Sequence, residues 1–180
     1  MARYRATVET TRDAEEVFAY LSDFSTTAEW DPGVLEAQRL DPEVKLGSRF
    51  RLLANFRGRQ AEIVYTVVRY EPPRLITLRG ENATVVSLDT IEVETVGAAA
   101  GAAAGARVTY DAQLSMKGIL RIGDPLLGRA FKPVGDNALA GLRRRLEQAD
   151  APLIAPASSA EPGSPAEPGS AAEPGSAAGP

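Results

Sequence analysis

The sequence contains neither cysteine nor histidine. Without cysteine the chain forms no disulfide and offers no thiolate nucleophile. Without histidine it excludes a Ser-His-Asp catalytic triad and every metal site built on imidazole. These two absences exclude the commonest classes of enzyme that use a nucleophilic side chain or a metal ion. We predict no metal and no cofactor.

Long apolar runs are also missing from the sequence. It has no stretch of about eighteen consecutive apolar residues, the length expected of a membrane-spanning helix. The first residues, MARYRATVETT, lack the apolar centre of a secretory signal. We therefore predict a cytoplasmic protein without an integral membrane segment.

Positive charge is scarce for a nucleic-acid-binding protein. The net charge is −4, with 20 Lys and Arg against 24 Asp and Glu. Residues 151–180 contain three of the glutamates and no basic residue, so residues 1–150 carry −1. A body this close to neutral lacks the basic face that phosphate contacts require, and we predict no nucleic-acid partner. The basic run 143–145 is predicted to be the solvated end of a helix.

The last part of the chain has a composition of its own. The repeat AEPGS begins at Ala160, Ala166 and Ala172. Proline and glycine at this density cannot bury enough apolar surface to offset the entropy lost on ordering. The sequence predicts one folded domain over residues 1–149 and a disordered AEPGS-repeat tail over residues 150–180.

The folded part is predicted to begin with a strand and a short helix. Over residues 2–10 apolar residues alternate with polar ones, which is typical of a half-buried strand. In the next segment Thr11 or Asp13 can cap a helix, and apolar residues recur at helical spacing from Val17 to Phe24. This spacing predicts a helix of about three turns.

Six further strands and a long helix follow in the prediction. Turns that contain glycine or proline separate the strands, which favours an antiparallel meander. The predicted strands cover Val34–Leu40, Ser48–Phe56, Gln60–Tyr70, Arg74–Gly80, Val85–Thr95 and Arg107–Met116. The low-complexity segment 96–106 is predicted to be a long hairpin loop. The helix is expected from Asp124 to residue 148, with Pro125 in its first turn and a kink or break at Pro133.

This order of elements predicts an α+β fold. A curved seven-stranded antiparallel sheet would wrap around the long C-terminal helix, with the short helix placed after the first strand. Sheet and helix cannot fill the space between them completely, so a cavity is expected there. Apolar cavities of this kind bind small ligands.

The only tryptophan of the chain lies in the sequence EWDPGV, residues 29–34. Asp31, Pro32 and Gly33 suit a type II turn, in which Gly33 takes the position that needs positive φ. An indole just before this turn could cap the mouth of the cavity or plug the edge of the core. The sequence leaves both roles for Trp30 open.

Four segments of the chain carry a resemblance to a known superfamily. They are VFAYLSDFSTTAEWDPGV (17–34), LGSRFRL (46–52), YTVVRYEPPRLITLRG (65–80) and RVTYDAQLSMKGIL (107–120). Together they resemble the SRPBCC superfamily, and within it the polyketide cyclase/dehydrase-like branch of the START and birch-pollen-allergen-like helix-grip domains. The resemblance covers about residues 2–148. It implies a helix-grip fold with an enclosed apolar cavity for a small hydrophobic molecule, and its motifs are not a catalytic signature.

Strand alternation selects the side chains that should face this cavity. The expected lining residues come from the turn after the short helix, the strands and the last helix: Trp30, Phe50, Leu52, Phe56, Tyr65, Val67, Ile91, Tyr110 and Phe131.

Asp89 has two interpretations. The period of two along VSLDTIEVET places it inside together with Ser87, whereas Leu88 argues for a bulge or an outward position. A carboxyl buried without a cation has a raised pKa and can serve as a general base, so Asp89, Tyr65 and Tyr110 are the candidate catalytic residues. The tyrosines can equally be wall residues whose hydroxyls find a partner.

Three functions fit the sequence. The first is binding or transport of a small hydrophobic molecule, such as a lipid, a polyketide or an isoprenoid-like compound. The second is a polyketide cyclase/dehydratase-type enzyme that acts by proton transfer inside the cavity. The third is a protein-interaction module. We favour binding because no inward pair of carboxylates is evident, and an Asp89 bonded to Tyr65 or Tyr110 would strengthen the enzyme. The sequence leaves the oligomeric state open.

Overall fold

The computed structural model describes residues 1–56, 58–97, 104–118, 124–148 and 153. The AEPGS-repeat tail and most of the predicted loop 96–106 lie outside these residues. The same holds for the side chains of Phe56 and of residues 124–130.

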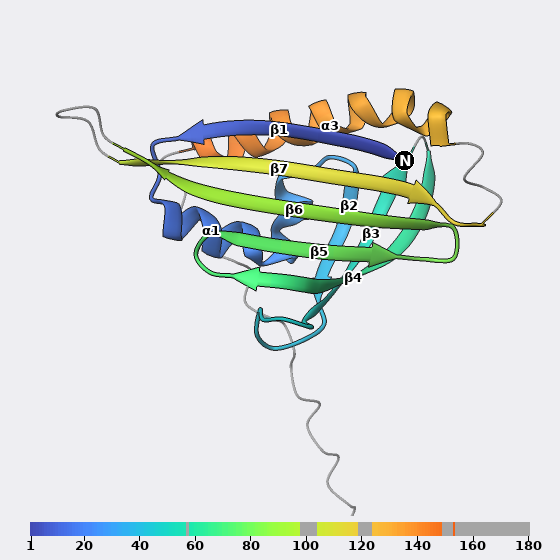
Figure 1. Ribbon diagram of the computed structural model, residues 1–180, viewed down its shortest axis with the longest axis horizontal. Helices are drawn as coiled ribbons and strands as arrows, with labels where there is room; N and C mark the ends of the chain where they lie inside the picture. The colour runs from blue at the N-terminus through green and yellow to red at the C-terminus, as the bar shows by residue number, and fades with distance from the viewer. Residues whose placement is uncertain (57, 98–103, 119–123, 149–152, 154–180) are drawn as a thin grey trace, which may run out of the picture.

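Seven strands form one antiparallel sheet in the order β1-β7-β6-β5-β4-β3-β2. The strands are β1 (Ala2–Thr10), β2 (Val34–Arg39), β3 (Arg49–Phe56), β4 (Arg59–Glu71), β5 (Leu75–Glu81), β6 (Val85–Val96) and β7 (Gly105–Met116). The helices are α1 (Ala14–Ser22), η1 (Phe24–Thr26), α2 (Thr27–Trp30) and α3 (Asp124–Glu147). Figure 1 shows this arrangement, which confirms the predicted α+β, helix-grip fold.

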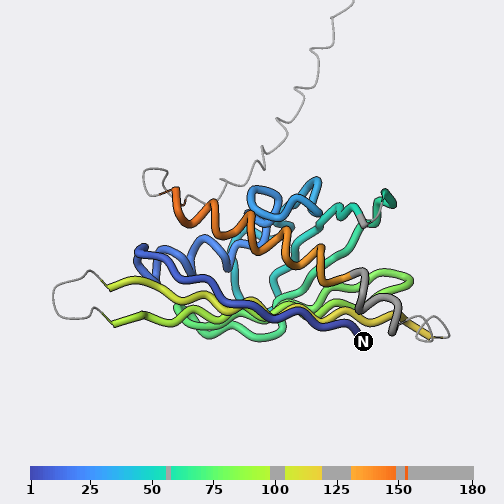
Figure 2. Tube along the Cα trace, turned by 90° about the horizontal axis from the view of Figure 1, so that it is seen from above, coloured from blue at the N-terminus to red at the C-terminus, as the bar shows by residue number. Residues whose placement is uncertain are grey.

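The sheet forms one layer and the helices lie on one side of it (Figure 2). The helix α3 packs most closely on β1, where a Cβ atom at Gly135 would come within 2.4 Å of the Tyr4 ring. Only a glycine therefore lets the helix approach the strand this closely. The inner face of the curled sheet and α3 enclose the buried core.

Strand alternation predicted the sheet closely, because each predicted strand differs from the observed one by at most two residues at either end. The helix α1 starts at the second of its two candidate caps. Asp13 Oδ1 accepts hydrogen bonds from the backbone N–H groups of Glu15 at 2.8 Å and Glu16 at 3.2 Å. Such a cap stabilises a helix by about 1 kcal/mol.

The type II turn predicted at Gly33 is wrong, and of the kink or break predicted at Pro133 the break is wrong. Among the described residues the glycines with positive φ are Gly47, Gly58 and Gly118, so the turn at Gly33 is not type II. Asp31 makes the turn instead, since its Oδ1 accepts from Gly33 N at 2.7 Å and its carbonyl accepts from Val34 N at 2.9 Å. This side-chain bond replaces the need for a left-handed glycine.

Pro133 does not break the last helix. The helix α3 runs from Asp124 to Glu147 with Pro133 inside it. A proline removes one helical hydrogen bond. Here Ala138, Leu142 and Leu146 bury the apolar face of the following turns, which maintains the helix beyond the missing bond.

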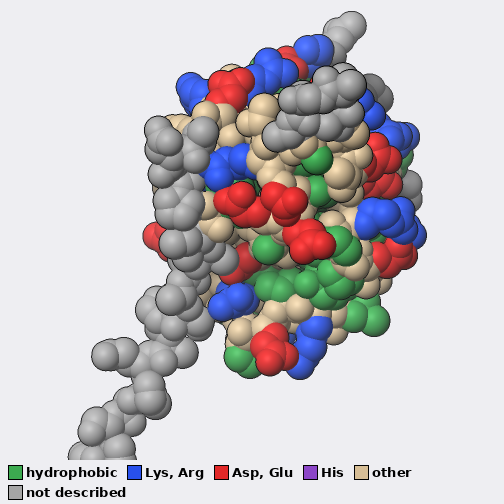
Figure 3. Space-filling model, turned by 90° about the vertical axis from the view of Figure 1, so that its left-hand side faces the viewer, with side chains coloured by type: hydrophobic (Ala, Val, Ile, Leu, Met, Phe, Trp, Pro, Cys, Tyr) green, Lys and Arg blue, Asp and Glu red, His purple; other side chains and the backbone are tan. Residues whose placement is uncertain are grey.

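The surface is charged and mixed in sign. On the face shown in Figure 3, acidic and basic side chains are interspersed around a small hydrophobic area. Across the outer side of β1 and β7, Arg3 pairs with Asp111 and Arg107 pairs with Glu9. Exposed pairs of this kind add little stability. Within the described residues, no helix has the length and apolarity needed to cross a bilayer.

Candidate functional site

Polar side chains meet on the inner face of the sheet, where β4, β6 and β7 contribute one residue or more each. Asp89 is only 3% exposed. Its Oδ1 accepts a hydrogen bond from the Tyr110 hydroxyl at 2.7 Å, and its Oδ2 accepts one from Ser87 Oγ at 2.6 Å. The Tyr65 hydroxyl interacts with both Ser87 and Asp89. We call Tyr65, Ser87, Asp89 and Tyr110 the Asp89 cluster.

A glycine lets Tyr65 reach this cluster from two strands away. Gly80 of β5 stands opposite Tyr65 of β4 on one side and opposite Ser87 of β6 on the other. A Cβ atom at Gly80 would lie 2.5 Å from the Tyr65 ring. The missing side chain therefore leaves room for the phenol to cross β5 toward Asp89.

Burial controls the protonation of the cluster. It raises the pKa of Asp89, although the hydrogen bonds from Ser87, Tyr110 and Tyr65 act in the opposite direction. It also raises the pKa of Tyr65 and of Tyr110 well above the usual value, and the nearby Asp89 charge adds to this effect. Both phenols therefore remain protonated donors, and Asp89 binds a proton more tightly than an exposed aspartate.

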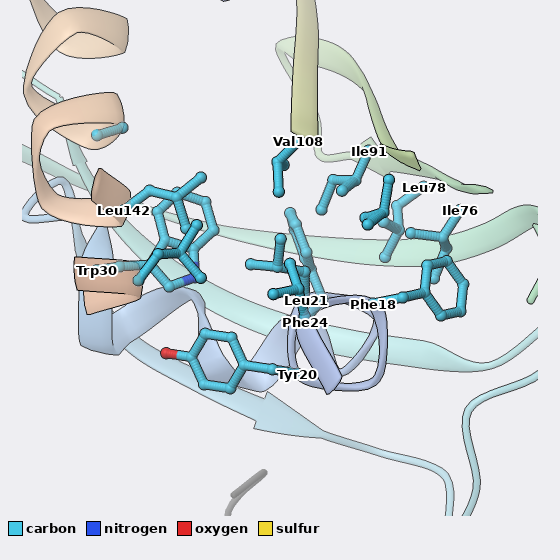
Figure 4. Packing of buried hydrophobic residues seen from close by; sticks show 14 of the residues in the cluster. Phe18, Tyr20, Leu21, Phe24, Trp30, Ile76, Leu78, Ile91, Val108 and Leu142 are labelled. Carbon is cyan, nitrogen blue, oxygen red and sulfur yellow. The ribbon is translucent and has the colours of Figure 1, made fainter. Parts of the chain in front are cut away.

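Trp30 lies inside the protein beside this cluster. It is 4% exposed, and its ring meets that of Tyr110 edge-on, with centroids 5.9 Å apart at 81°. Figure 4 shows the indole next to Leu142 of α3, with its nitrogen on the side away from Leu142. Trp30 Nε1 is buried and has no hydrogen-bond partner within the part of the chain that the structure describes. Of the two roles left open by the sequence, this burial contradicts a cap that faces solvent.

The sequence analysis did not select Asp31 as a site residue, because its position in the turn already explains why an aspartate lies there. Its carboxyl is half-buried. Burial raises the pKa of Asp31 to about 6, the bond from Gly33 N opposes this, and the charge of Asp89 adds to it. The Asp31 charge in turn raises the pKa of Tyr65 and Tyr110. Asp31 therefore acts electrostatically on the Asp89 cluster, and its place beside the lone tryptophan was the available signal.

Neither Asp31 nor Asp89 takes part in any ion pair within the described part of the chain. The described residues also contain no group of three or more acidic side chains placed to hold a metal ion. The chemistry available here is hydrogen bonding and proton transfer by two carboxyls and two phenols.

The structure places most of the predicted lining residues in the interior. Tyr65 and Tyr110 join Asp89, and the prediction that the period of two puts Asp89 inside with Ser87 is confirmed. The alternative of a bulge or outward position for Asp89 is wrong. Phe50, Leu52, Val67 and Ile91 belong to the buried core. Phe131 is half-buried on α3, and the Phe56 side chain lies outside the described residues.

Tyr110 keeps accessible surface although it points toward the inner side of the sheet. It projects from the middle of β7 toward Asp89 and Trp30, yet it is only half-buried. Leu114, one inward position beyond Ala112 on the same strand, is half-buried too. These two inward side chains are therefore not fully covered by their neighbours. The accessible surface beside the Asp89 cluster is where a ligand would contact these polar groups.

A second hollow has a different character. A groove of about 440 Å³ is lined by residues of α2, β2, β3 and β4: Ala28, Glu36, Ala37, Gln38, Arg51, Leu53 and Glu62. Arg51 already bonds to Gln38 and Glu62 across it, and these side chains are exposed. Its polar groups partner one another, so the interior remains the better candidate site.

The substitution Asp31→Asn is expected to stabilise the protein near neutral pH. The folded-state pKa of about 6 exceeds the ordinary value of 3.8, so folding favours the protonated carboxyl. The stabilisation that depends on this proton is complete below about pH 4 and is lost as the pH rises through about 6. Asparagine keeps an oxygen for Gly33 N and carries no charge, so unfolding free energy should rise by about 1–2 kcal/mol above that range.

Urea unfolding at a series of pH values measures this effect. The matched control is Asp111→Asn on the outer face, where the carboxyl is held by exposed Arg3. The Asp111→Asn substitution should leave the pH dependence of the unfolding free energy unchanged between about pH 4 and about pH 6. If Asp31→Asn has a lower unfolding free energy than the wild type at neutral pH, the charge of the half-buried Asp31 carboxyl does not destabilise the fold.

Comparison with protein families matches residues 1–147 to a family described as polyketide cyclase / dehydrase and lipid transport. Comparison with curated protein sequences finds no match. Among solved structures, a START superfamily protein from Mycobacterium smegmatis is 18% identical with a TM-score of 0.66, covering 82% of this chain and 99% of that one.

Two further solved structures are similar in fold. A protein from Thermus thermophilus is 14% identical with a TM-score of 0.63, covering 80% of this chain and 96% of that one. The di-domain ARO/CYC BexL from the BE-7585A biosynthetic pathway is 18% identical with a TM-score of 0.61, covering 80% of this chain and 46% of that one. The family match spans the whole folded domain, and the chain belongs to the polyketide cyclase/dehydrase and lipid transport family of the SRPBCC superfamily.

Proposed function

We propose that this protein binds a small, mainly apolar molecule between the inner face of the sheet and α3. A polar group of that molecule would meet the Asp89 cluster, and its apolar part would lie against the aromatic and aliphatic side chains around it. The observation that carries this proposal is Tyr110, which points inward to the buried Asp89 and still keeps accessible surface. The family, whose description includes lipid transport, supports a hydrophobic ligand.

Native mass spectrometry of the protein purified from its host tests this function. The expected result is an additional mass that disappears on denaturation. A matched pair of variants locates it: Ala112→Phe on the inner face, opposite Asp89, and Gln113→Phe at the next position, which faces outward. The inner substitution should abolish the additional mass and the outer one should keep it. An additional mass that survives both, or that is never seen, would contradict the proposal.

A second candidate function is catalysis by proton transfer, which the two interior carboxyls favour. Asp31, with its pKa raised to about 6 by burial, can exchange a proton near physiological pH. When Asp89 holds a proton, it can donate to the Tyr110 oxygen 2.7 Å away, which frees the Tyr110 hydroxyl to donate to a developing enolate oxygen. These are the groups that a polyketide cyclase/dehydratase needs, since it moves protons next to carbonyl groups.

Deuterium exchange measures this proton transfer without a known substrate. A small β-diketone in heavy water exchanges its acidic methylene hydrogens when a base removes a proton and solvent returns a deuteron. The protein should accelerate this exchange, and Asp31→Asn should lower the acceleration by about a hundredfold. If the exchange rate is the same with and without the protein, catalysis of proton transfer is contradicted and ligand binding remains the proposed function.

A further inference from the structure

Among the described residues no cation pairs with Asp89, the most deeply buried carboxyl of the candidate site. The described groups that hydrogen-bond to Asp89 are neutral hydroxyls, from Ser87, Tyr65 and Tyr110. Elsewhere the protein treats a buried carboxyl differently: Asp23, which is 2% exposed, pairs with Arg39 at 3.1 Å. A buried carboxyl is normally either paired with a cation or neutralised by a proton, so without a cation folding favours the protonated form of Asp89. A cation that reached Asp89 would displace this proton.

The second carboxyl that acts on the same space also lacks a cation. Asp31 accepts only from Gly33 N, and the ion pairs of the described residues do not include it. The titratable groups that face this space are Tyr65 from β4, Asp89 from β6 and Tyr110 from β7. On α3, the described residues Ala138 and Leu142 are buried, and neither side chain carries a charge.

Aromatic rings surround the same space. Trp30 and Tyr110 meet edge-on, and Phe24 packs on Tyr65 with centroids 5.0 Å apart. Indole and phenol faces attract cations, most strongly where water is excluded. Beside Tyr110, Trp30 Nε1 is buried and finds no hydrogen-bond acceptor among the described residues. Asp89 thus lacks a cation and the indole N–H lacks an acceptor within the described part of the chain.

We propose that the ligand of this site is an apolar amine, whose protonated nitrogen binds at Asp89 against the rings of Trp30 and Tyr110. This inference rests on the proposed binding function and specifies its ligand class. The ammonium provides the counter-charge that the described residues do not supply, and its N–H groups donate to the carboxylate oxygens of Asp89. A neutral ligand of the same shape leaves both carboxyls unpaired.

Phenethylamine and its neutral counterpart phenethyl alcohol test the ligand class. The fluorescence of Trp30, the only tryptophan, reports their binding directly. Near neutral pH the amine should bind about tenfold more tightly than the alcohol, or better. Asp89→Asn should remove this preference, while the matched control Asp111→Asn on the outer face should retain it. Asp31→Asn provides a second interior variant should Asp89→Asn not fold.

Proton release gives a measurement that needs no variant. A cation bound at Asp89 lowers the pKa of this carboxyl, and its charge acts on Asp31 in the same direction, so amine binding near pH 6 should release protons from the protein. Calorimetry in two buffers of different ionisation enthalpy measures the number released, which should be clearly above zero for the amine and zero for the alcohol.

The outcomes separate this inference from the function on which it rests. If the alcohol binds as tightly as the amine, or if the amine releases no protons, the amine inference is wrong and the proposed binding function stands. If neither compound binds and the native protein carries no additional mass, both are wrong.

Discussion

The substitution Gly141→Ala is expected to lower the free energy of unfolding by about 3 kcal/mol. A glycine-to-alanine change inside a helix ordinarily stabilises by about 0.5–1 kcal/mol. Here an alanine Cβ would lie 1.8 Å from the Trp30 carbonyl oxygen. Since the obstacle is backbone, α2 and α3 must move apart, and Trp30 and Asp31 move with α2.

Thermal or urea unfolding measures the loss, and Trp30 emission should shift to longer wavelength in the folded variant as the indole gains water. The control is Gly97→Ala, where a Cβ meets nothing within 4 Å. It should change stability by less than about 0.5 kcal/mol. A Gly141→Ala protein as stable as the wild type, with unchanged emission, would show that α2 and α3 are not in this close contact.

The substitution Phe24→Ala is expected to cost about 4 kcal/mol of unfolding free energy. Phe24 is 2% exposed and packs against Phe50 and Tyr65, with ring centroids 6.2 Å and 5.0 Å away. Its loss removes the burial of a large aromatic side chain and leaves a cavity under the site. Tyr65 also loses the ring that fixes its orientation toward Asp89.

Chemical unfolding measures this loss of unfolding free energy, and Leu46→Ala is the control. Leu46 is also large and apolar, but it is 66% exposed, so its removal should change stability by less than about 0.5 kcal/mol. Similar small losses for both variants would mean that Phe24 is not part of a packed core. Phe24→Leu should recover part of the lost stability, because it refills most of the volume.

The sheet was predictable because its signal is local. In β1, β3, β4, β6 and β7 the alternation of apolar and polar residues follows from which face each side chain occupies, whereas Leu75–Leu78 of β5 are buried on both faces. Val108 and Tyr110 of β7 illustrate this, since both were placed inward by the pattern and both face the interior. Turn residues then fixed the ends of the strands to within two residues.

The site was only partly predictable because its contacts join distant segments. Asp31 has a complete local explanation as a turn residue, and only the fold shows that its charge acts on Tyr65 and Tyr110. The orientation of Asp89 was ambiguous, because its apolar neighbour Leu88 disturbs the alternation of apolar and polar residues. No local pattern reports that Gly80 leaves the path by which Tyr65 reaches β6.

Arg145 shows the same limit on the surface. The basic run 143–145 predicted a solvated helix end, yet the Arg145 side chain is 16% exposed. Its Nε donates to Glu29 at 3.2 Å, and its guanidinium lies 5.2 Å from the centre of the Tyr20 ring. Glu29 also accepts from the Tyr20 hydroxyl at 2.8 Å, so these three residues tie α1, α2 and α3 together. A charge run in sequence does not reveal such a partner.

Quenching of Trp30 by bromocyclohexane tests most directly whether an apolar molecule occupies the space beside the Asp89 cluster. Bromine quenches an indole only on contact, and Trp30 is shielded from solvent at 4% exposure. A bound guest predicts quenching that saturates with concentration and that Ala112→Phe abolishes. Quenching that rises without saturation, to the same extent in the wild type and in Ala112→Phe, would contradict an internal binding site.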